Sequence, residues 1–307
     1  MIGVFIVAAV LTIAVPVYAQ SPQTVARPNV RLPDETAGVE AIVRTLISAF
    51  DQADIVALGE VHGQRTDSDL RIALLRHPDF AKKVHSIVVE FASTAQQPTL
   101  DRYIRGEDVP TAELAQVWKT TSQSAFGVWE SPIYADFLAA VRDVNKRLPA
   151  DARIRVLAGD PPAGATTARD ASAISVLKKE VLEKHGKALV IYGAAHFYRR
   201  EVNQILLANG GGITKLLDAD YPGRTFVVLP MGGAGPEFRK FESAMKTSVR
   251  PVLVSLQRPP FRDFTAEEFI KMLNCLGAKS VPDGCVSAFH RSGAALGQLG
   301  DAAIYWR

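Results

Sequence analysis

The chain has 307 residues, of which 48% are hydrophobic and 22% charged, and this balance excludes both a disordered chain and a polytopic membrane protein. The net charge of +3 is small for this length, and Lys and Arg are spread without a dense run, so no nucleic-acid partner is expected. The length is compatible with one or two domains.

The first 19 residues contain no charged side chain. An apolar run extends from Ile2 to Val15, Pro16 interrupts it, and Val17-Tyr18-Ala19 offers the small or branched residues that a signal peptidase requires. We predict a signal peptide over residues 1–19, cleavage near Ala19, and export to the periplasm or the extracellular space. The alternative is an uncleaved anchor, but the run is shorter than the roughly 20 residues that span a bilayer, so we expect no stable span in the mature chain.

Residues 20–36 are rich in Pro, Gln and Arg and lack periodicity, which predicts an extended leader. No linker-like segment follows, so we expect a single α/β domain over residues 37–307. Cys275 and Cys285 flank the turn-like Pro282-Asp283-Gly284, and in an exported protein this spacing favours a local disulfide over a metal site.

Short apolar runs alternate with helical patterns along the rest of the chain. The predicted strands are 55–58, 86–89, 154–157, 188–192, 225–229 and 252–256. The predicted helices are 39–49, 67–75, 100–105, 111–119, 134–147, 170–185 and 200–209. This alternation predicts an α/β fold with a mostly parallel sheet covered by helices on both faces. The helical segment at about 98–147 is long for one crossover, so we expect it to form a cap over the edge where the strands end.

Polar side chains follow four of these strands. Gly59-Glu60-Val61-His62 follows the first strand, Glu90 ends the second, Asp160 follows the third, and Gly193-Ala194-Ala195-His196 follows the fourth. Ligands of parallel α/β sheets bind outside the carboxyl ends of the strands, so these side chains are expected to form one site. A buried carboxylate needs a cation, a metal or hydrogen bonds, and neighbouring histidines supply partners. The set can therefore bind a divalent metal or act as general acid and base on water.

Each of these residues also has a structural explanation. The histidines His62 and His196 can be core residues bonded to backbone carbonyls. The carboxylates Glu60 and Glu90 can form structural ion pairs with arginines, and Asp160 can cap the turn before the following prolines.

Further residues are candidates for binding a cofactor or ligand beside Asp160. Arg65 can neutralise a carboxylate or bind an anionic substrate, and Tyr198 can donate a hydrogen bond or ligate a bound group. Trp118, Trp129 and Tyr134 lie in the predicted cap and can line a pocket for a bulky apolar ligand. Surface roles for Arg65 and core packing for the aromatic residues are the alternatives.

The paired Gly-x-x-His motifs, with Glu60 inside the first and Glu90 ending the next strand, resemble those of the Tiki/TraB, ChaN-like and erythromycin-esterase superfamily. The resemblance covers about residues 55–197 and is closest to ChaN-like proteins, which bind haem and are linked to iron uptake. In Tiki-type metalloproteases the paired histidines hold a divalent metal. Erythromycin esterases use a related Glu and His set to activate water, but their first motif has one more residue between Glu and His, which weighs against macrolide hydrolysis.

By this resemblance, His62 and His196 bind a metal or activate water, with Glu60 and Glu90 as acidic partners or further metal ligands. The favoured function is an exported hydrolase, with or without a divalent metal, that cleaves an ester, a lactone or a peptide bond. The second is a haem-binding protein of iron uptake, in which a His or Tyr ligates the iron. A family member that binds a small ligand without catalysis is the third.

Overall fold

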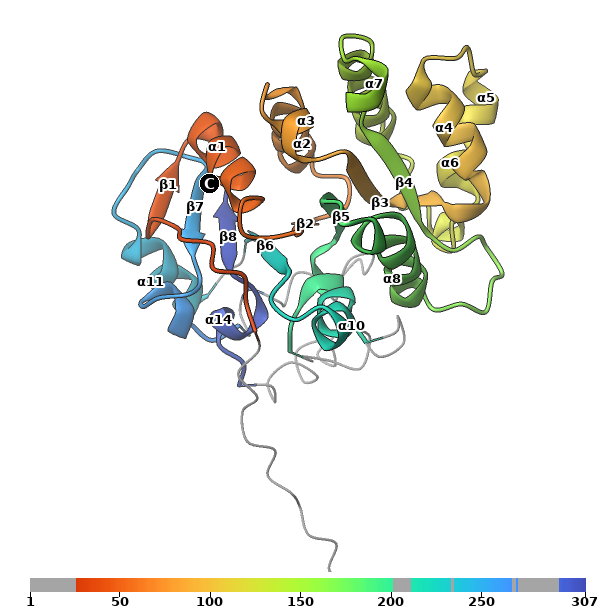
Figure 1. Cartoon of the computed structure of the whole chain (residues 1–307). Coiled ribbons are helices and arrows are strands. Elements are labelled where there is room, and N and C mark those ends of the chain that lie inside the picture. The colour runs from red at the N-terminus through yellow and green to blue at the C-terminus, as the bar shows by residue number, and fades with distance from the viewer. Residues whose placement is uncertain (1–25, 201–210, 233–234, 267–268, 270–292) are drawn as a thin grey trace, which may run out of the picture.

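The computed structural model describes residues 26–200, 211–232, 235–266, 269 and 293–307. Their strands form one eight-stranded sheet in the order β1-β7-β8-β6-β2-β5-β3-β4 (Figure 1). The strands are β1 (Glu35–Ala37), β2 (Ile55–Glu60), β3 (Ser86–Ser93), β4 (Arg155–Asp160), β5 (Ala188–Gly193), β6 (Thr225–Met231), β7 (Val252–Ser255) and β8 (Ala302–Tyr305). Only β7 runs against its neighbours, so the predicted mostly parallel sheet is confirmed.

Helices cover both faces of this sheet, as predicted. Alternate residues of each strand face opposite sides, so Val56 and Leu58 join one buried cluster while Ile55 and Ala57 join the other. The helices whose apolar residues join the first cluster include α1 (Val39–Ala49), α2 (Arg65–Arg76), α3 (Phe80–Lys83), α4 (Gln97–Arg105) and α7 (Ile133–Asn145). Those that complete the second are α8 (Arg169–Glu180), α10 (Ile213–Asp220), α11 (Pro236–Ala244) and α14 (Leu296–Leu299).

In the predicted cap segment, α4 and α7 pack on the first face beside α2. The stretch from α6 (Gln116–Lys119) to the start of α7 reaches the ends of the strands, where Ser122 bonds to Asp160 and Tyr134 to Glu60. The segment predicted as helical over 111–119 is helical in the structure, divided at one residue into α5 (Thr111–Leu114) and α6. The helix predicted over 170–185 ends at Glu180, and His185 has a φ of 54°, which a helix does not continue through.

The two chain-terminal strands escaped prediction because they are short. Strand β1 has three residues and β8 has four, which is too little for a recognisable alternation. The predicted signal peptide, the first part of the leader, the helix over 200–209 and both cysteines lie outside the described residues. Among the described residues, no helix has both the length and the apolar character needed to cross a membrane.

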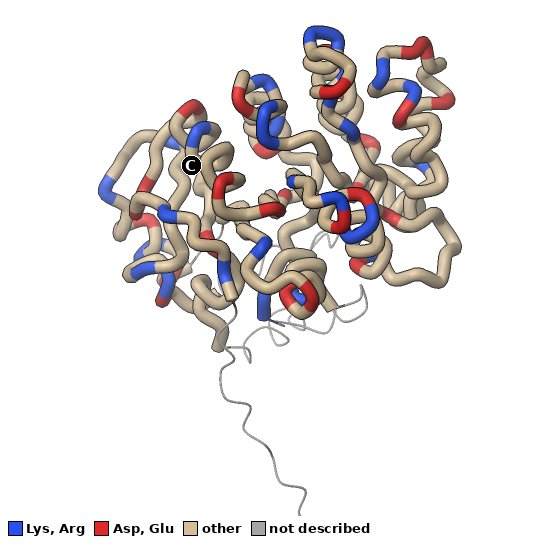
Figure 2. Tube along the Cα trace, viewed as in Figure 1, with Lys and Arg blue, Asp and Glu red and all other residues tan. Residues whose placement is uncertain are grey.

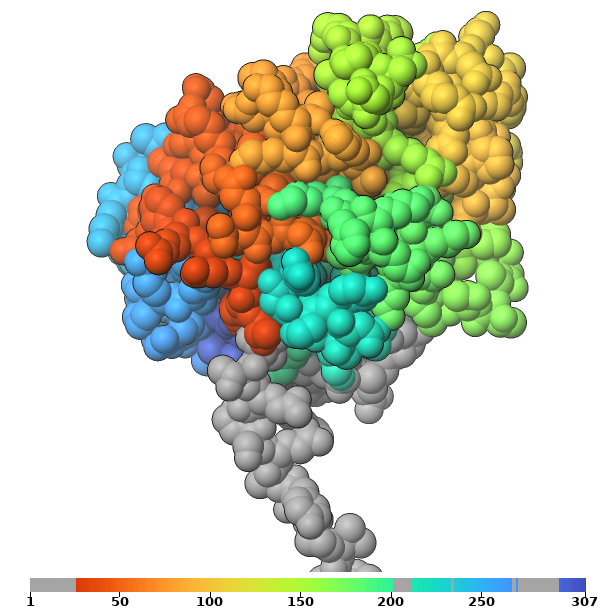
Figure 3. All heavy atoms as spheres, in the orientation of Figure 1, coloured from red at the N-terminus to blue at the C-terminus, as the bar shows by residue number. Residues whose placement is uncertain are grey.

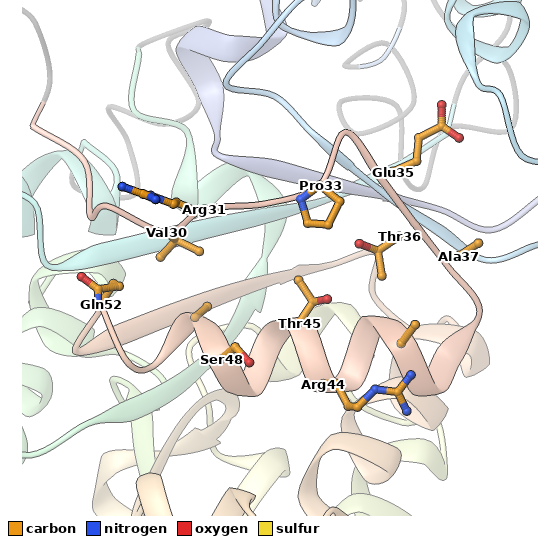
Figure 4. A pocket seen from close by; sticks show the side chains of 12 residues that line it. Val30, Arg31, Pro33, Glu35, Thr36, Ala37, Arg44, Thr45, Ser48 and Gln52 are labelled. Carbon is orange, nitrogen blue, oxygen red and sulfur yellow. The ribbon is translucent and has the colours of Figure 1, made fainter.

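Residues 26–37 are an extended segment that lies against the C-terminal part of the chain (Figure 3). Their last residues form β1 at the sheet edge, and a groove of about 540 Å³ separates them from α1 (Figure 4). Thr36, Thr45 and Ser48 line this groove. Figure 2 shows positive and negative residues interspersed along the helices of the outer layers.

A buried ion network fixes the chain on the second face. Arg199 is fully buried and contacts Asp218 and Asp301, with 2.7 Å between its Nη2 and Asp301 Oδ2. Asp301 also accepts hydrogen bonds from the backbone N–H of Val227 at 2.8 Å and from Arg27 at 2.8 Å. The network therefore ties the N-terminal segment to β6 and β8, and Arg199 stands only a few residues after the second Gly-x-x-His motif.

We predict that Asp301→Asn lowers the free energy of unfolding by about 3 kcal/mol, because breaking a buried ion pair leaves a buried charge poorly compensated. The exposed pair Arg262–Asp263 supplies the control, and Asp263→Asn is expected to change stability much less, because solvent screens an exposed ion pair. Urea denaturation of both variants measures the difference. Equal effects of the two substitutions would contradict a stabilising role for the network.

Candidate functional site

Four adjacent strands deliver the predicted site residues to one edge of the sheet. In the order β2-β5-β3-β4, the register pairs Glu60 with Gly193 and Ser93 with Asp160. The sequence predicts that the second strand ends at Glu90. In the structure this strand, β3, continues to Ser93, with a register shift between Val89 and Ser93. Such an irregularity re-aims side chains, and here it lies where Glu90 turns towards β5.

Glu60 and His62 form a carboxylate–imidazole pair. His62 Nδ1 lies 2.7 Å from Glu60 Oε1, and the imidazole packs edge-on against Trp129 with ring centroids 4.7 Å apart. The His62 side chain is 27% exposed, whereas Glu60 is buried. His62 is therefore the member of the pair that an incoming molecule can reach.

Glu60 stays charged because several groups compensate its burial. Burial alone raises the pKa of this carboxyl, but Arg71 and the hydrogen bonds from His62 and Tyr134 outweigh it and lower the pKa to about 2. Arg71 Nη2 lies 2.5 Å from Glu60 Oε2 and is itself buried. The Tyr134 hydroxyl donates to Glu60 at 3.2 Å and accepts from the backbone N–H of Gly63 at 3.1 Å, so it also holds the motif loop.

Glu90 lies at the centre of the site and contacts residues of both motifs. Its Oε2 accepts a hydrogen bond from the backbone N–H of Gly193 at 2.6 Å, and its Oε1 contacts Arg169 and lies 3.2 Å from His196 Nε2. The same carboxylate approaches the first motif, because Oε2 lies 4.0 Å from His62 Nε2. Glu90 thus lies between the two imidazoles.

His196 is held between two carboxylates. Its Nδ1 lies 2.5 Å from Asp170 Oδ1 and its Nε2 faces Glu90, and the side chain is only 5% exposed. Asp170 also accepts a hydrogen bond from the backbone N–H of Gly212 at 2.8 Å. A carboxylate only accepts hydrogen bonds, so both contacts are bonded when both ring nitrogens carry a proton. This arrangement fixes the imidazole and leaves it little access to an incoming molecule.

Asp160 belongs to the same cluster but serves to hold the cap. Its Oδ2 accepts two hydrogen bonds of 2.7 Å from the backbone N–H and the hydroxyl of Ser122, and its Oδ1 accepts from Arg169 Nε at 2.9 Å. The Arg169 guanidinium bridges Asp160 on β4 and Glu90 on β3. Through the bonds from Ser122 to Asp160, the cap segment is joined to the same group.

The glycines of the two motifs are required by close approach. A Cβ on Gly193 would lie 2.9 Å from the His62 imidazole, and one on Gly59 would lie 2.9 Å from the Pro230 ring. Contacts this short are not tolerated between a Cβ and a ring atom, so both positions admit only glycine without rearrangement.

Two predicted ligand-binding residues lie elsewhere. Arg65 is exposed on α2 and pairs with Asp69 and Asp136, so the cation that neutralises Glu60 is Arg71. Tyr198 is buried in the second cluster, and burial raises the pKa of its hydroxyl, which opposes the phenolate form that ligates iron.

Sequence reasoning missed several residues of the site. Arg71, Arg169 and Asp170 complete its ion pairs, and for Tyr134 the sequence predicts only core packing or a place in a pocket wall. A signal was present for Arg169 and Asp170, because they begin the helix that follows β4 and therefore lie at the same edge as the strand ends. Arg71 carries no such signal, because it is one of several charged residues on α2.

The cluster carries an excess of negative charge. Within the described residues, the carboxylates Glu60, Glu90, Asp160 and Asp170 face the guanidinium groups of Arg71 and Arg169. One potential ligand atom from each of Glu60, His62 and Glu90 lies within 4.8 Å of the others, which is compatible with a metal ion. Oxygen and imidazole donors suit divalent zinc, manganese or iron.

Fold and site together define an α/β protein with a buried Glu/His cluster at the carboxyl edge of its sheet. Residues 46–163 match a family model described as haem-binding uptake, Tiki superfamily, ChaN. Residues 46–163 are therefore similar to ChaN-type proteins of the Tiki superfamily, and the predicted resemblance is confirmed over this segment. The matched segment contains Glu60, His62, Glu90 and Asp160, whereas His196 lies beyond it.

Three solved structures are similar to this chain at low sequence identity, and one of them has a TM-score above 0.5. A protein from Bacillus cereus superposes with a TM-score of 0.53 at 11% identity, covering 91% of this chain and 94% of its own. The type III effector HopBA1 gives 0.43 at 14% identity, covering 67% and 88% of the two chains. ChaN of Campylobacter jejuni, described with cofacial haem binding, gives 0.39 at 14% identity over 64% and 87%. The comparison with curated proteins found no match.

The depressed pKa of Glu60 predicts a loss of stability in acid. The carboxyl has a pKa of about 2 when folded against an ordinary 4.5, so its stabilising effect is present above pH 4.5 and is lost as the pH falls towards 2. The full effect is about 3 kcal/mol, and about 2 kcal/mol of it is lost by pH 3. Urea denaturation from pH 7 to 3 should show the gap between wild type and Glu60→Gln shrinking below pH 4.5. A gap that is independent of pH would refute the assignment.

Proposed function

We propose that this protein is a hydrolase in which His62 and Glu90 activate a water molecule against an ester, lactone or peptide carbonyl. The observation that carries the proposal is the placement of His62. Its Nδ1 is held by the Glu60 carboxylate at 2.7 Å, its Nε2 faces Glu90 Oε2 at 4.0 Å, and its side chain is partly exposed. A general base must be held in one orientation and remain reachable, and His62 meets both requirements.

The Glu60 carboxylate selects the useful tautomer of His62. Because the pKa of Glu60 is about 2, the carboxylate is ionised at neutral pH and can only accept a hydrogen bond. His62 Nδ1 therefore carries the proton, and the lone pair of the neutral ring is on Nε2. This is the nitrogen that faces Glu90 and the partly exposed side of the site.

The spacing between His62 and Glu90 fits a water molecule. A water that makes hydrogen bonds of about 2.8 Å to both Nε2 and Oε2 can bridge two atoms 4.0 Å apart. His62 takes one proton as the water oxygen bonds to the carbonyl carbon. It then returns that proton to the leaving oxygen or nitrogen as the tetrahedral intermediate breaks down, so the enzyme ends unchanged.

The remaining cluster residues position these two groups. Glu90 is fixed by Arg169, by the Gly193 backbone and by His196, and Asp170 in turn fixes His196. His196 is buried and its ring nitrogens are both engaged, so we assign it a positioning role rather than contact with the substrate. Its effect on catalysis passes through Glu90.

A divalent cation is compatible with the same residues. His62 Nε2 and an oxygen of Glu90 would hold it, with Glu60 either as a third ligand or as the carboxylate that orients His62. The excess of carboxylates favours a bound cation, whereas the contact of Arg169 with Glu90 already neutralises one of them. When bound, such an ion lowers the pKa of a coordinated water towards neutrality.

Haem binding is the second candidate, and the match to a haem-binding uptake family favours it. Of the site residues described, His62 is the one whose imidazole is accessible for iron, since His196 and Tyr198 are buried. Export to the periplasm or cell exterior, proposed from the apolar N-terminal run, is compatible with both functions.

We predict that His62→Ala lowers kcat for a hydrolysed substrate by about 10² to 10⁴-fold, the usual contribution of a general base. A panel of p-nitrophenyl esters, lactones and unstructured peptides provides the substrate, and turnover is measured before and after dialysis against EDTA. His85→Ala is the matched control, because His85 is exposed at the opposite, amino-terminal end of β3. Turnover that persists at wild-type levels in His62→Ala would rule out its role as base.

Titration with hemin separates the two functions. If the protein binds haem through His62, a shifted Soret band should saturate at a fixed ratio of hemin to protein and should be lost in His62→Ala. The proposed hydrolase predicts no saturable band. A band that saturates equally in wild type and His62→Ala would assign the haem to another residue.

A further inference from the structure

A further buried carboxylate, that of Asp67, lies beside the first Gly-x-x-His motif and has no role in the mechanism above. Asp67 is in the first turn of α2 and is 7% exposed. Its Oδ2 accepts a hydrogen bond from the backbone N–H of Val61 at 3.0 Å, and its Oδ1 accepts one from the Trp306 indole at 2.9 Å. Trp306 directly follows β8, so Asp67 links the first motif to that strand.

The hydrogen bond to Val61 matters because Val61 lies between Glu60 and His62. The 2.7 Å separation of His62 Nδ1 from Glu60 Oε1 spans this single residue, so it depends on the position of the Val61 backbone. On the other side of His62, the backbone N–H of Gly63 donates to the Tyr134 hydroxyl at 3.1 Å. A side chain therefore holds the backbone immediately before His62 and another holds it immediately after.

Asp67 also shares the positive charge of Arg71 with Glu60. Arg71 lowers the pKa of both carboxyls and forms an ion pair with Glu60. For Asp67, burial has the larger effect and raises the pKa of the carboxyl, and the nearby Glu60 charge adds to this. A buried carboxylate is stable only when it is paired or hydrogen-bonded, so Asp67 depends on its donors, the Val61 N–H and the Trp306 indole.

We propose that Asp67 is a positioning residue of the proposed hydrolysis: it fixes the backbone between Glu60 and His62, and the Trp306 indole in turn orients its carboxylate. Because Asp67 is buried and both of its oxygens are engaged, we assign it no contact with the substrate. Its effect passes through the orientation of the His62 imidazole. The effect on turnover rests on the proposed function, whereas the effect on the geometry of the His62–Glu60 pair does not.

The variant Asp67→Asn tests this role, because it keeps the size of the side chain and removes one acceptor. An amide NH2 cannot accept a hydrogen bond, so in the present arrangement Asn pairs with the Val61 N–H or with the Trp306 indole but not with both. We expect kcat to fall by about 10 to 10²-fold, with KM unchanged within about twofold, because only the placement of the base is altered. Asp69→Asn, at an exposed position of the same helix that pairs with Arg65, should leave both constants unchanged.

Nitrogen-15 NMR of the imidazoles gives a readout that does not depend on turnover. The chain has six histidines, so the His62 signals are assigned by their loss in His62→Ala. In wild type at pH 8, His62 should show a protonated Nδ1 and an unprotonated Nε2. In Asp67→Asn the two signals should move towards each other as the ring samples both tautomers, whereas Asp69→Asn should leave them in place.

The variant Trp306→Phe tests the second contact, because it removes the indole N–H and keeps an aromatic ring. It should move the His62 signals and lower kcat in the same direction as Asp67→Asn, but less, because the Val61 hydrogen bond remains. Tyr103→Phe is the control, since it removes one polar hydrogen from a ring that, like that of Trp306, is partly buried against the first cluster. Should urea denaturation show that Asp67→Asn does not fold, Trp306→Phe decides by the same criteria.

The outcomes separate this proposal from the proposed hydrolysis. A folded Asp67→Asn whose His62 signals and kcat match wild type would overturn the positioning role and leave the hydrolase proposal intact. A fall in kcat without movement of the His62 signals would also overturn it, because Asp67 would then act only through stability. If wild type hydrolyses no member of the substrate panel while Asp67→Asn still moves the signals, the hydrolase proposal fails and Asp67 stands as the residue that positions the pair.

Discussion

The structure of the site depends on the burial of one carboxylate, that of Glu90. A charge removed from water at the centre of a sheet must be compensated on every side. Glu90 obtains this from the Arg169 guanidinium, from the Gly193 backbone and from His196, which come from a helix and from the end of the neighbouring strand. The contacts that compensate the charge of Glu90 therefore hold β3, β5 and α8 in fixed positions relative to one another.

The need to compensate the buried Glu90 charge also places the histidines of the two Gly-x-x-His motifs in different surroundings, although the motifs look alike in sequence. The first imidazole, His62, lies on the partly exposed side and has one nitrogen engaged by a carboxylate. The second, His196, is buried with both nitrogens engaged. In the function we propose, chemistry with an external molecule needs a free lone pair, so we assign it to His62. We assign His196 the role of holding Glu90 at a distance from His62 that a water molecule can bridge.

The convergence of the site was predictable from sequence because it follows from topology. Strand ends of a parallel sheet meet at one edge, so the polar residues after each strand had to be neighbours. Their partners were not predictable to the same degree. Arg65 and Arg71 both lie on α2, and only the orientation of that helix on the sheet decides that Arg71 faces inward while Arg65 faces solvent. The shift in β3 that turns Glu90 towards β5 likewise depends on pairing between strands.

The cap also bears on the choice between hydrolysis and haem binding. Both functions require the same lone pair on His62 Nε2, so one atom cannot serve both at once. A planar porphyrin ligated at that nitrogen needs open space around the imidazole, whereas Trp129 packs against the ring and Glu90 lies 4.0 Å from the nitrogen. Tyr134 and the Ser122–Asp160 hydrogen bonds hold the cap segment in this position. Opening the site for a porphyrin would break these contacts, whereas a water molecule that bridges His62 Nε2 and Glu90 Oε2 would leave them in place, and this difference supports the proposed hydrolysis.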